Sequence, residues 1–585
     1  MKSFFSTFFA SLLALIVFSV FGLLIFITVI SAVSSSSEKE TLAAKSILVV
    51  DLAKKYEEVG ELNPFAAFGD EDDMSVPSSY ETVRLIKAAA KDSNIEGIYL
   101  ACGTNSNGFG TSDEIRNALL EFKSTKKFVI AYSNVITQGG YFVANVADKI
   151  YCNPQGGLDW RGYSMNYFFM KGALDKLEIE PQIFYAGKFK SATEPFRVDK
   201  MTEPNRLQSG VLMNDLYQTL LLQTASARKI DTANLRAYAD QHQVALATDA
   251  VKLHLIDGVR YDDEVKAEMR QRMGLDKDSK INMVSLAKYA KSASFKPFGK
   301  DKIGVIYAQG DIIDGKAERN SIGSESYVTL VRKLHHDPAI KAIVVRINSG
   351  GGSSMASENI WRALTLARKD KPVVVSFGDV AASGGYYMAC NADSIFAHPN
   401  TITGSIGVFS IIPNLQNFFD HKLGVTFDGV KTGPFAEAIS VTKPLSDAQK
   451  AWLQRDVDSI YQTFLSRVAE GRKISKASVD SIGQGRVWSG QRALQLGLVD
   501  RLGGLEDAIA CAARMAKTKD YRLREYPEPQ TIFERVFGGV QQQAASTAIR
   551  KEIGLEQYQL LQQLQKVKAI TGIPQTRLPW DFIIE

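Results

Sequence analysis

One serine, Ser383, lies in a sequence setting that could make it a nucleophile. The β-branched run 373–375 ends in small residues, and Ser383 is followed by Gly384, Gly385 and an apolar run without proline. This order predicts a strand that delivers the serine to the first turn of a helix, where free N–H groups would favour an oxyanion. Gly384 has no Cβ, so a carbonyl could approach it closely. The simpler interpretation is a serine N-cap on an ordinary helix.

A serine nucleophile needs a general base, and the usual one is histidine. None of the six histidines has a suggestive setting, since His335 and His336 lie in a polar turn and His398 precedes a proline. A Ser-His-Asp triad is therefore not expected. Lysine remains, because burial or a nearby cation can lower its pKa towards neutrality. Composition alone does not select one lysine.

The chain contains two copies of one unit, related by an offset of 245 residues. The first copy has lost the serine and the glycine loop that the second has at 350–352. It keeps a lysine-containing segment, 187–196, that the second copy lacks, so each copy retains what the other has discarded. The matched pairs include Gln138 with Ser383, Asp148 with Asp393, and Pro154 with Pro399.

With these motifs the sequence resembles the long, duplicated form of signal peptide peptidase A, a Ser/Lys protease of the inner membrane. The resemblance covers about residues 45–505. It implies an α/β fold of tandem ββα-superhelix domains related to Clp protease and crotonase, with an N-terminal transmembrane helix. The motifs are Gly-Asp-x-Ala-Ala-Ser383-Gly-Gly-Tyr, Thr-Gly-Ser405-Ile-Gly, Phe189-Lys190-Ser-Ala-x-Glu-Pro-Phe, and Gly485-Arg-Val-Trp488-Ser-Gly490 with Gly497-Leu-Val-Asp500.

The same resemblance assigns roles to individual residues. Ser383 would be the nucleophile, Lys190 the general base, and Ser405 a hydrogen-bond partner that holds the lysine in place. Lys188 is the rival base, two residues away. The oxyanion would be held by the region of Gly351, Gly352 and Gly384. The family usually has proline where this chain has Gly350, which loosens the loop but keeps its amides. No cofactor or metal is implied.

The N-terminus carries a segment without charged residues from position 4 to position 33. As a helix rising ~1.5 Å per residue it exceeds the ~30 Å hydrocarbon core, so we expect it to span a bilayer. A cleaved signal peptide ending near Ala32 is the alternative, but the run is about twice a typical 7–15-residue signal core. With Lys2 before the segment, the positive-inside rule puts the N-terminus in the cytoplasm. The catalytic domains would then lie on the periplasmic side of a bacterial cytoplasmic membrane.

Four segments are expected: an anchor over 1–40, a first domain over 41–290 that supplies the lysine, a second over 291–525 that supplies the serine, and a helical tail over 526–585. Alternating strand and helix patterns predict βαβ units in both domains. The spacing of apolar residues also predicts long helices over 203–227 and 447–471. The loop 60–79 has no counterpart in the repeat and no assigned role.

Composition excludes several classes of protein. With 45% hydrophobic and 23% charged residues, the chain is globular rather than disordered. The net charge of +5 comes without a basic stripe, which argues against nucleic-acid binding. The glycine loop lacks the Gly-Lys-Ser/Thr ending of a nucleotide-binding loop. We expect neither a disulfide nor a metal site from Cys102, Cys152, Cys390 and Cys511, whose apolar settings are typical of buried thiols.

The sequence therefore predicts a membrane-anchored serine endopeptidase that degrades cleaved signal peptides through an acyl-enzyme. By resemblance its partners are signal peptides, the lipid bilayer and further copies of itself, as a homotetramer. Two alternatives stay open: a catalytically inactive tethered scaffold, and an acyl-CoA-binding enzyme of the crotonase type. The sequence does not decide whether the lysine reaches the serine within one chain or across a subunit boundary.

Overall fold

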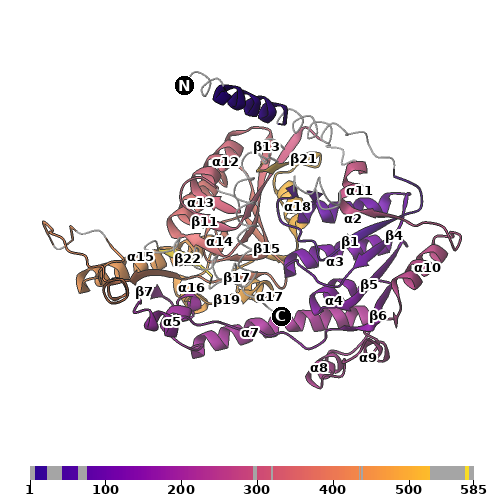
Figure 1. Ribbon diagram of the computed structural model, residues 1–585, viewed down its shortest axis with the longest axis horizontal. Helices are drawn as coiled ribbons and strands as arrows, with labels where there is room; N and C mark the ends of the chain where they lie inside the picture. The colour runs from indigo at the N-terminus through magenta and orange to yellow at the C-terminus, as the bar shows by residue number, and fades with distance from the viewer. Residues whose placement is uncertain are drawn as a thin grey trace.

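The computed structural model describes residues 7–22, 42–62, 75–293, 299–317, 320–433, 435–436, 439–527 and 574–578. Two mainly parallel sheets lie at its centre, one from each half of the chain, and helices pack around them (Figure 1). Each sheet has its own apolar core, built largely from Val, Ile, Leu and Ala.

The first sheet has the strand order β8-β6-β5-β4-β1-β9, and all its pairs are parallel. Its strands are β1 (Ser46–Asp51), β4 (Ile95–Ala101), β5 (Phe128–Ile136), β6 (Lys149–Leu158), β8 (Gly258–Val259) and β9 (Asn282–Ser285). The connecting helices include α2 (Ser79–Lys91), α3 (Phe109–Ser124), α4 (Gln138–Ala144), α10 (Asp262–Arg272) and α11 (Leu286–Ser292).

The second sheet has the order β19-β17-β15-β13-β10-β21, with β16 beside β15 and β20 beside β16. Its strands are β10 (Asp301–Gln309), β13 (Ile340–Ser349), β15 (Val373–Ala382), β16 (Ser394–Ala397), β17 (Ile402–Gly404), β19 (Val487–Ser489), β20 (Arg501–Leu502) and β21 (Tyr521–Tyr526). Its helices include α12 (Ser324–His336), α13 (Ser354–Ala367), α14 (Gly384–Ala389), α17 (Gly490–Gln495) and α18 (Leu505–Met515). The neighbours β10-β13-β15-β16 repeat β1-β4-β5-β6, which confirms the predicted duplication.

A third sheet joins the two halves. Its order is β12-β11-β14-β22-β18-β7, with strands β7 (Glu180–Ala186), β11 (Asp311–Ile313), β12 (Ser321–Gly323), β14 (Gly351–Ser353), β18 (Val408–Asn414) and β22 (Gln575–Arg577). Strand β7 comes from the first half, yet it pairs antiparallel with β18 over its whole length. This pairing carries the segment that follows β7 into the second half.

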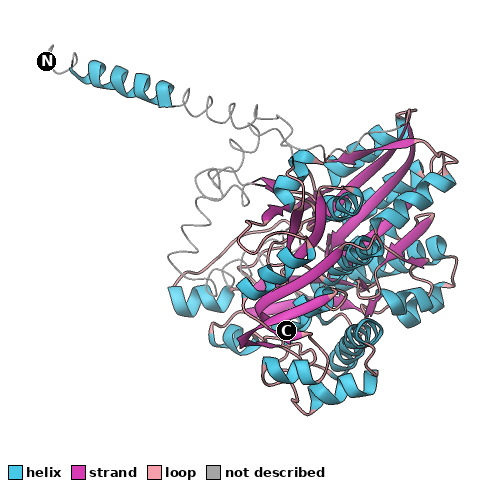
Figure 2. Cartoon of the chain, turned by 90° about the vertical axis from the view of Figure 1, so that its right-hand side faces the viewer, coloured by secondary structure: helices cyan, strands magenta, loops and turns pink. Residues whose placement is uncertain are grey.

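The two predicted long helices are present as α7 (Glu203–Arg228) and α15 (Asp447–Arg472). Both begin after a side-chain N-cap, Thr202 or Ser446, and both end at a lysine in the left-handed conformation. Figure 2 shows the helices lying around the central strands. The shorter described elements are β2 (Glu61–Leu62), β3 (Ser75–Val76), α5 (Lys171–Lys176), α6 (Glu194–Arg197), α8 (Thr232–Asp240), α9 (Ala247–Lys252) and α16 (Lys476–Ile482).

Two expected segments fall partly or wholly outside the described residues. Residues 7–22 form a helix with exposed apolar side chains, but the rest of the expected span, 4–6 and 23–33, is not described. Within the part of the chain that is described, no helix combines the length and the apolar character needed to cross a bilayer. Most of the expected helical tail, 526–585, is likewise not described; of its described parts, 526–527 and 574–578, the first begins with the last residue of strand β21 and the second contains a strand.

Candidate active site

Lys190 follows strand β7 and is buried, with only 1% of its surface exposed. Gly187, at φ +102°, turns the chain, and the Phe189 N–H donates to the Gln484 carbonyl at 2.9 Å. The side chain of Gln208 in α7 donates to the carbonyl of Phe189 and accepts from the N–H of Val487. The lysine segment is therefore held from both halves of the chain.

Ser383 lies between strand β15 and helix α14, where the sequence predicts it. Its backbone angles are φ 53° and ψ −114°, and its hydroxyl makes no capping hydrogen bond to the helix. A positive φ at a residue with a Cβ costs on the order of 1–3 kcal/mol and persists only where the surrounding structure holds it. Ser383 is thus not an ordinary N-cap, and its hydroxyl is aimed elsewhere.

The structure brings Lys190, Ser383 and Ser405 together within one chain. The Lys190 Nζ lies 3.0 Å from the Ser383 Oγ and 3.1 Å from the Ser405 Oγ. It also lies 3.5 Å from the carbonyl oxygen of Ser405. Ser405 follows β17 and has a positive φ of 52°, so both serines present their hydroxyls from strained turns.

The environment of Lys190 favours its neutral form. Burial lowers the pKa of its amine from 10.5 to about 7. The aromatic ring of Phe409 lies 5.8 Å from the Nζ. The alternative base, Lys188, is exposed, with its Nζ over the ring of Phe189 at 5.3 Å. The structure therefore favours Lys190 over Lys188 as the candidate base, a choice that the sequence without the family resemblance leaves open.

The glycines expected at the oxyanion site lie beside the serine. Gly351 has φ +103°, and a Cβ added to it would lie 2.8 Å from the backbone nitrogen of Gly384. Their backbones are therefore in close contact, next to Ser383. A Cβ at Gly352 would instead collide with the backbone of Ile312 in strand β11. Gly352 thus packs the loop against its neighbour, while the backbone of Gly351 lies against that of Gly384, the residue after Ser383.

Two further glycines, Gly407 and Gly485, lie against Lys190. Both belong to motifs noted in the sequence, but the sequence alone assigns them no role. A Cβ at Gly485 would lie 2.7 Å from the Lys190 Cα, and one at Gly407 would lie 3.2 Å from its Cδ. The missing side chains let the backbone close over the lysine and exclude water. In the sequence, Gly483 and Gly485 lie close together, which indicates a tight backbone segment. The sequence does not indicate that this segment contacts Lys190.

The corresponding position of the first half carries no such chemistry. Gln138 begins α4, as the repeat predicts. Its side-chain amide donates to the Gly162 carbonyl at 2.7 Å, and its carbonyl oxygen accepts from the N–H groups of Arg161 and Gly162. The glutamine thus ties down a loop.

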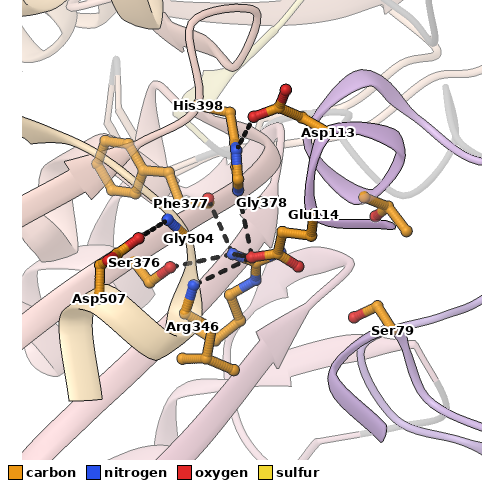
Figure 3. A network of polar contacts seen from close by, with 12 residues as sticks. Ser79, Asp113, Glu114, Arg346, Ser376, Phe377, Gly378, His398, Gly504 and Asp507 are labelled. Atoms are coloured by element: carbon orange, nitrogen blue, oxygen red, sulfur yellow. Dashed lines mark hydrogen bonds and ion pairs between the residues drawn. The ribbon is translucent and has the colours of Figure 1, made fainter. Parts of the chain in front are cut away.

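Among the described residues, no histidine forms a hydrogen bond with Ser383. His398 instead joins a buried charged network between the halves (Figure 3). Its ring nitrogens lie 2.9 Å from an Asp113 oxygen and 3.2 Å from a Glu114 oxygen, and Glu114 also pairs with Arg346 at 3.1 Å. Burial alone would lower the pKa of His398, but hydrogen bonds to the two carboxylates raise it to about 9. No motif in the sequence indicates this cluster.

A cavity of about 1010 Å³ lies between the two halves. Its lining includes Asn105 and Gln138 from the first half, and Gly350, Phe409 and Leu578 from the second half and the C-terminal segment. The cavity thus reaches Gln138, the counterpart of Ser383 in the first copy, and the start of the glycine loop of the second copy, while Ser383 and Lys190 lie buried and outside its lining. The four cysteines are buried free thiols, as their sequence setting predicts.

Comparison with known proteins gives matches over most of the chain. The family model of peptidase family S49 matches residues 121–276 and 365–519, one match in each half. The chain is 34% identical to Protease 4 of Salmonella typhi over 538 residues, which cover 89% of this chain and 86% of the relative. It is 31% identical to "Serine protease SPPA, chloroplastic" of Arabidopsis thaliana, covering 77% and 68%. A solved structure of a ClpP1 mutant from Listeria monocytogenes matches 35% of this chain and 94% of that chain, with 15% identity and a TM-score of 0.24. With so low a score, the specific Clp-type fold remains an expectation from the sequence.

Proposed function

Because the chain belongs to peptidase family S49 and is a serine protease, we propose that Ser383 is its nucleophile and Lys190 its general base. The observation that carries this proposal is the 3.0 Å contact between the Lys190 Nζ and the Ser383 Oγ. The pKa of about 7 that burial gives the lysine leaves about half of it neutral at pH 7. A neutral amine at hydrogen-bond distance can accept the hydroxyl proton.

The reaction follows from this geometry in two stages. Neutral Lys190 takes the proton of Ser383 as the Oγ attacks the scissile carbonyl, and the resulting ammonium protonates the departing amine. Water then attacks the acyl-serine with the same lysine as base. Ser405, whose hydroxyl lies 3.1 Å from the Nζ, orients the lysine during both stages.

Backbone N–H groups near Gly351 and Gly384 supply the oxyanion site. Such donors stabilise the negative charge that develops on the carbonyl oxygen, and removing one typically costs a factor of about 10²–10³ in rate. The close approach of the two backbones supports this role, since a Cβ on Gly351 would fill the space between them. Gly352 contributes through packing of the loop.

The substrates and the location are proposed on the sequence resemblance. Cleaved signal peptides are the proposed substrates, and the uncharged run 4–33 is the proposed single-pass anchor, with the catalytic domains outside the cytoplasm. Alkaline extraction of membranes tests the anchor. Full-length protein should stay with the membrane pellet, whereas a chain lacking residues 1–40 should be released. We also propose a homotetramer, which light scattering of the purified protein tests.

Labelling by an active-site serine probe tests the catalytic pair. Wild type and Lys188→Ala should react with the probe, whereas Ser383→Ala and Lys190→Ala should not. Circular dichroism of each variant checks that it is folded. Loss of labelling in Lys188→Ala with retention in Lys190→Ala would overturn the assignment of the base, and labelling of Ser383→Ala would overturn that of the nucleophile.

A further inference from the structure

The described C-terminal residues, 574–578, lie at the proposed active site. Strand β22 pairs antiparallel with β14, the strand that contains Gly351 and Gly352, in the register Gly352 to Thr576. On its other edge it contacts β18 through Phe409 and Gln575. It therefore fills the space between two strands of the second half, as an extended peptide does when it adds to sheet edges.

The carbonyl of Thr576 lies next to the proposed oxyanion site. A Cβ on Gly351 would collide with the Thr576 carbonyl oxygen, and one on Gly384 would lie 3.0 Å from it. The Thr576 hydroxyl donates to the Gly352 carbonyl at 3.2 Å, and the residue is fully buried. This carbonyl thus lies against both glycines of the proposed oxyanion site, one of which, Gly384, directly follows Ser383 in the chain.

The residues that follow Thr576 are also held. The Leu578 N–H donates to the Gly350 carbonyl at 2.8 Å, and the Arg577 guanidinium pairs with Asp311. The Leu578 side chain, 7% exposed, packs in an apolar pocket built from both halves. The pocket residues include Leu212 and Leu216 of α7 and Ala382, Ile402 and Val487 of the second half.

We infer that residues 574–578 occupy the substrate groove as a tethered, substrate-like strand and compete with external peptides. Thr576 takes the position before the scissile bond, and Leu578 fills a pocket that accepts an apolar side chain two residues beyond that bond. This inference rests on the proposed function, because it takes Ser383 as the nucleophile. Ser383 has no exposed surface in this state, although an external peptide must reach its hydroxyl.

A binding experiment tests the inference without requiring catalysis. Two forms of the Ser383→Ala protein are compared, the full chain and a chain that ends at residue 573. The probe is a fluorescent peptide with the sequence of residues 572–580, and anisotropy reports binding. The truncated form should bind the peptide at least tenfold more tightly, because a tethered strand acts at a high effective concentration. The same peptide with Leu578→Asp should bind weakly to both forms. Equal affinity for the two forms, or no binding to the truncated one, would overturn the inference.

A rate measurement separates this inference from the proposed function. In the otherwise unaltered full chain, Leu578→Asp should expel the strand and raise kcat/KM for a short fluorogenic peptide several-fold. Leu246→Asp, the same change at a side chain that is 62% exposed, should leave the rate unchanged. An unchanged or lower rate for Leu578→Asp, with normal serine-probe labelling, contradicts the strand competition alone. If no form hydrolyses peptides or reacts with the probe, the proposed function itself fails.

Discussion

At the scale of single residues, the charge of Lys190 should set the rate. Burial lowers the pKa of its amine to about 7, and only the neutral amine can act as a base. We expect kcat/KM to fall about tenfold per pH unit below pH 7 and to level off above it. Initial rates on a fluorogenic peptide between pH 5 and 9 measure this profile. A rate that stays constant from pH 5 to 7 would show that the lysine is not the base.

Substitution of Ser405 tests whether a second hydroxyl orients the base. Ser405→Ala removes the 3.1 Å contact with the Lys190 Nζ, so kcat should fall about 10- to 100-fold with little change in KM. Ser410→Ala is the matched control, because Ser410 is equally buried and its hydroxyl has no hydrogen-bond partner among the described residues. Equal kcat values for the two variants would remove Ser405 from the mechanism.

The sequence locates these residues better than it predicts their conformation. The repeat points to Ser383 and to the lysine-containing segment 187–196, because each copy keeps one and lacks the other, and the family resemblance then selects Lys190 over Lys188. The positive φ of Ser383 is not predicted, since a serine before a helix normally takes an extended conformation and caps it. Tertiary contacts override that local preference, and the hydroxyl meets the lysine instead.

At the scale of elements, the loop containing Gly485 determines where Lys190 lies. Gly485→Ala would bring a Cβ to 2.7 Å from the Lys190 Cα, so the backbones must move apart. A displacement of about 1 Å in a catalytic group can cost a factor of about 10² in rate. Gly497→Ala is the control, because Gly497 also has a positive φ, of 72°, but no atom within 4 Å of the added Cβ. We expect activity to drop about 100-fold in the first variant and to persist in the second, as kcat/KM would show.

Strands and helices with strong patterns are predictable from this sequence, and pairings between distant segments are not. The central strands of the two sheets and helices α7 and α15 follow from apolar runs and helical spacing. Strand β22 has only three residues, two of them polar and one charged, so no alternation marks it. It exists because β14 and β18 offer open edges, which a local pattern cannot reveal.

At the scale of the whole molecule, the halves must stay docked, because the amine and the hydroxyl come from different copies of the repeat. The complementary loss in the two copies predicts this dependence from the sequence. The buried charges that support it are not predictable from the sequence, since they come from segments far apart in the chain, around positions 58, 114, 346 and 398. Arg346 of β13 contacts Glu58 at 2.9 Å and Glu114 at 3.1 Å, and both carboxylates belong to the first half.

Glu114 is the centre of that network, so its charge should matter for stability. Burial alone would raise its pKa, but Arg346 and His398 lower it to about 2, and it is therefore ionised at neutral pH. Glu114→Gln removes one of the buried carboxylates that pair with Arg346 and His398. We expect it to lower the free energy of unfolding by about 3 kcal/mol. Glu121→Gln, the same change at an exposed position of helix α3, should cost less than about 0.5 kcal/mol. The midpoint of guanidinium unfolding should fall only for Glu114→Gln.

The loss of peptidase activity should follow that same transition, because separation of the halves takes Lys190 away from Ser383. Equal midpoints for the two variants would show that the charge of Glu114 does not help to hold the halves together.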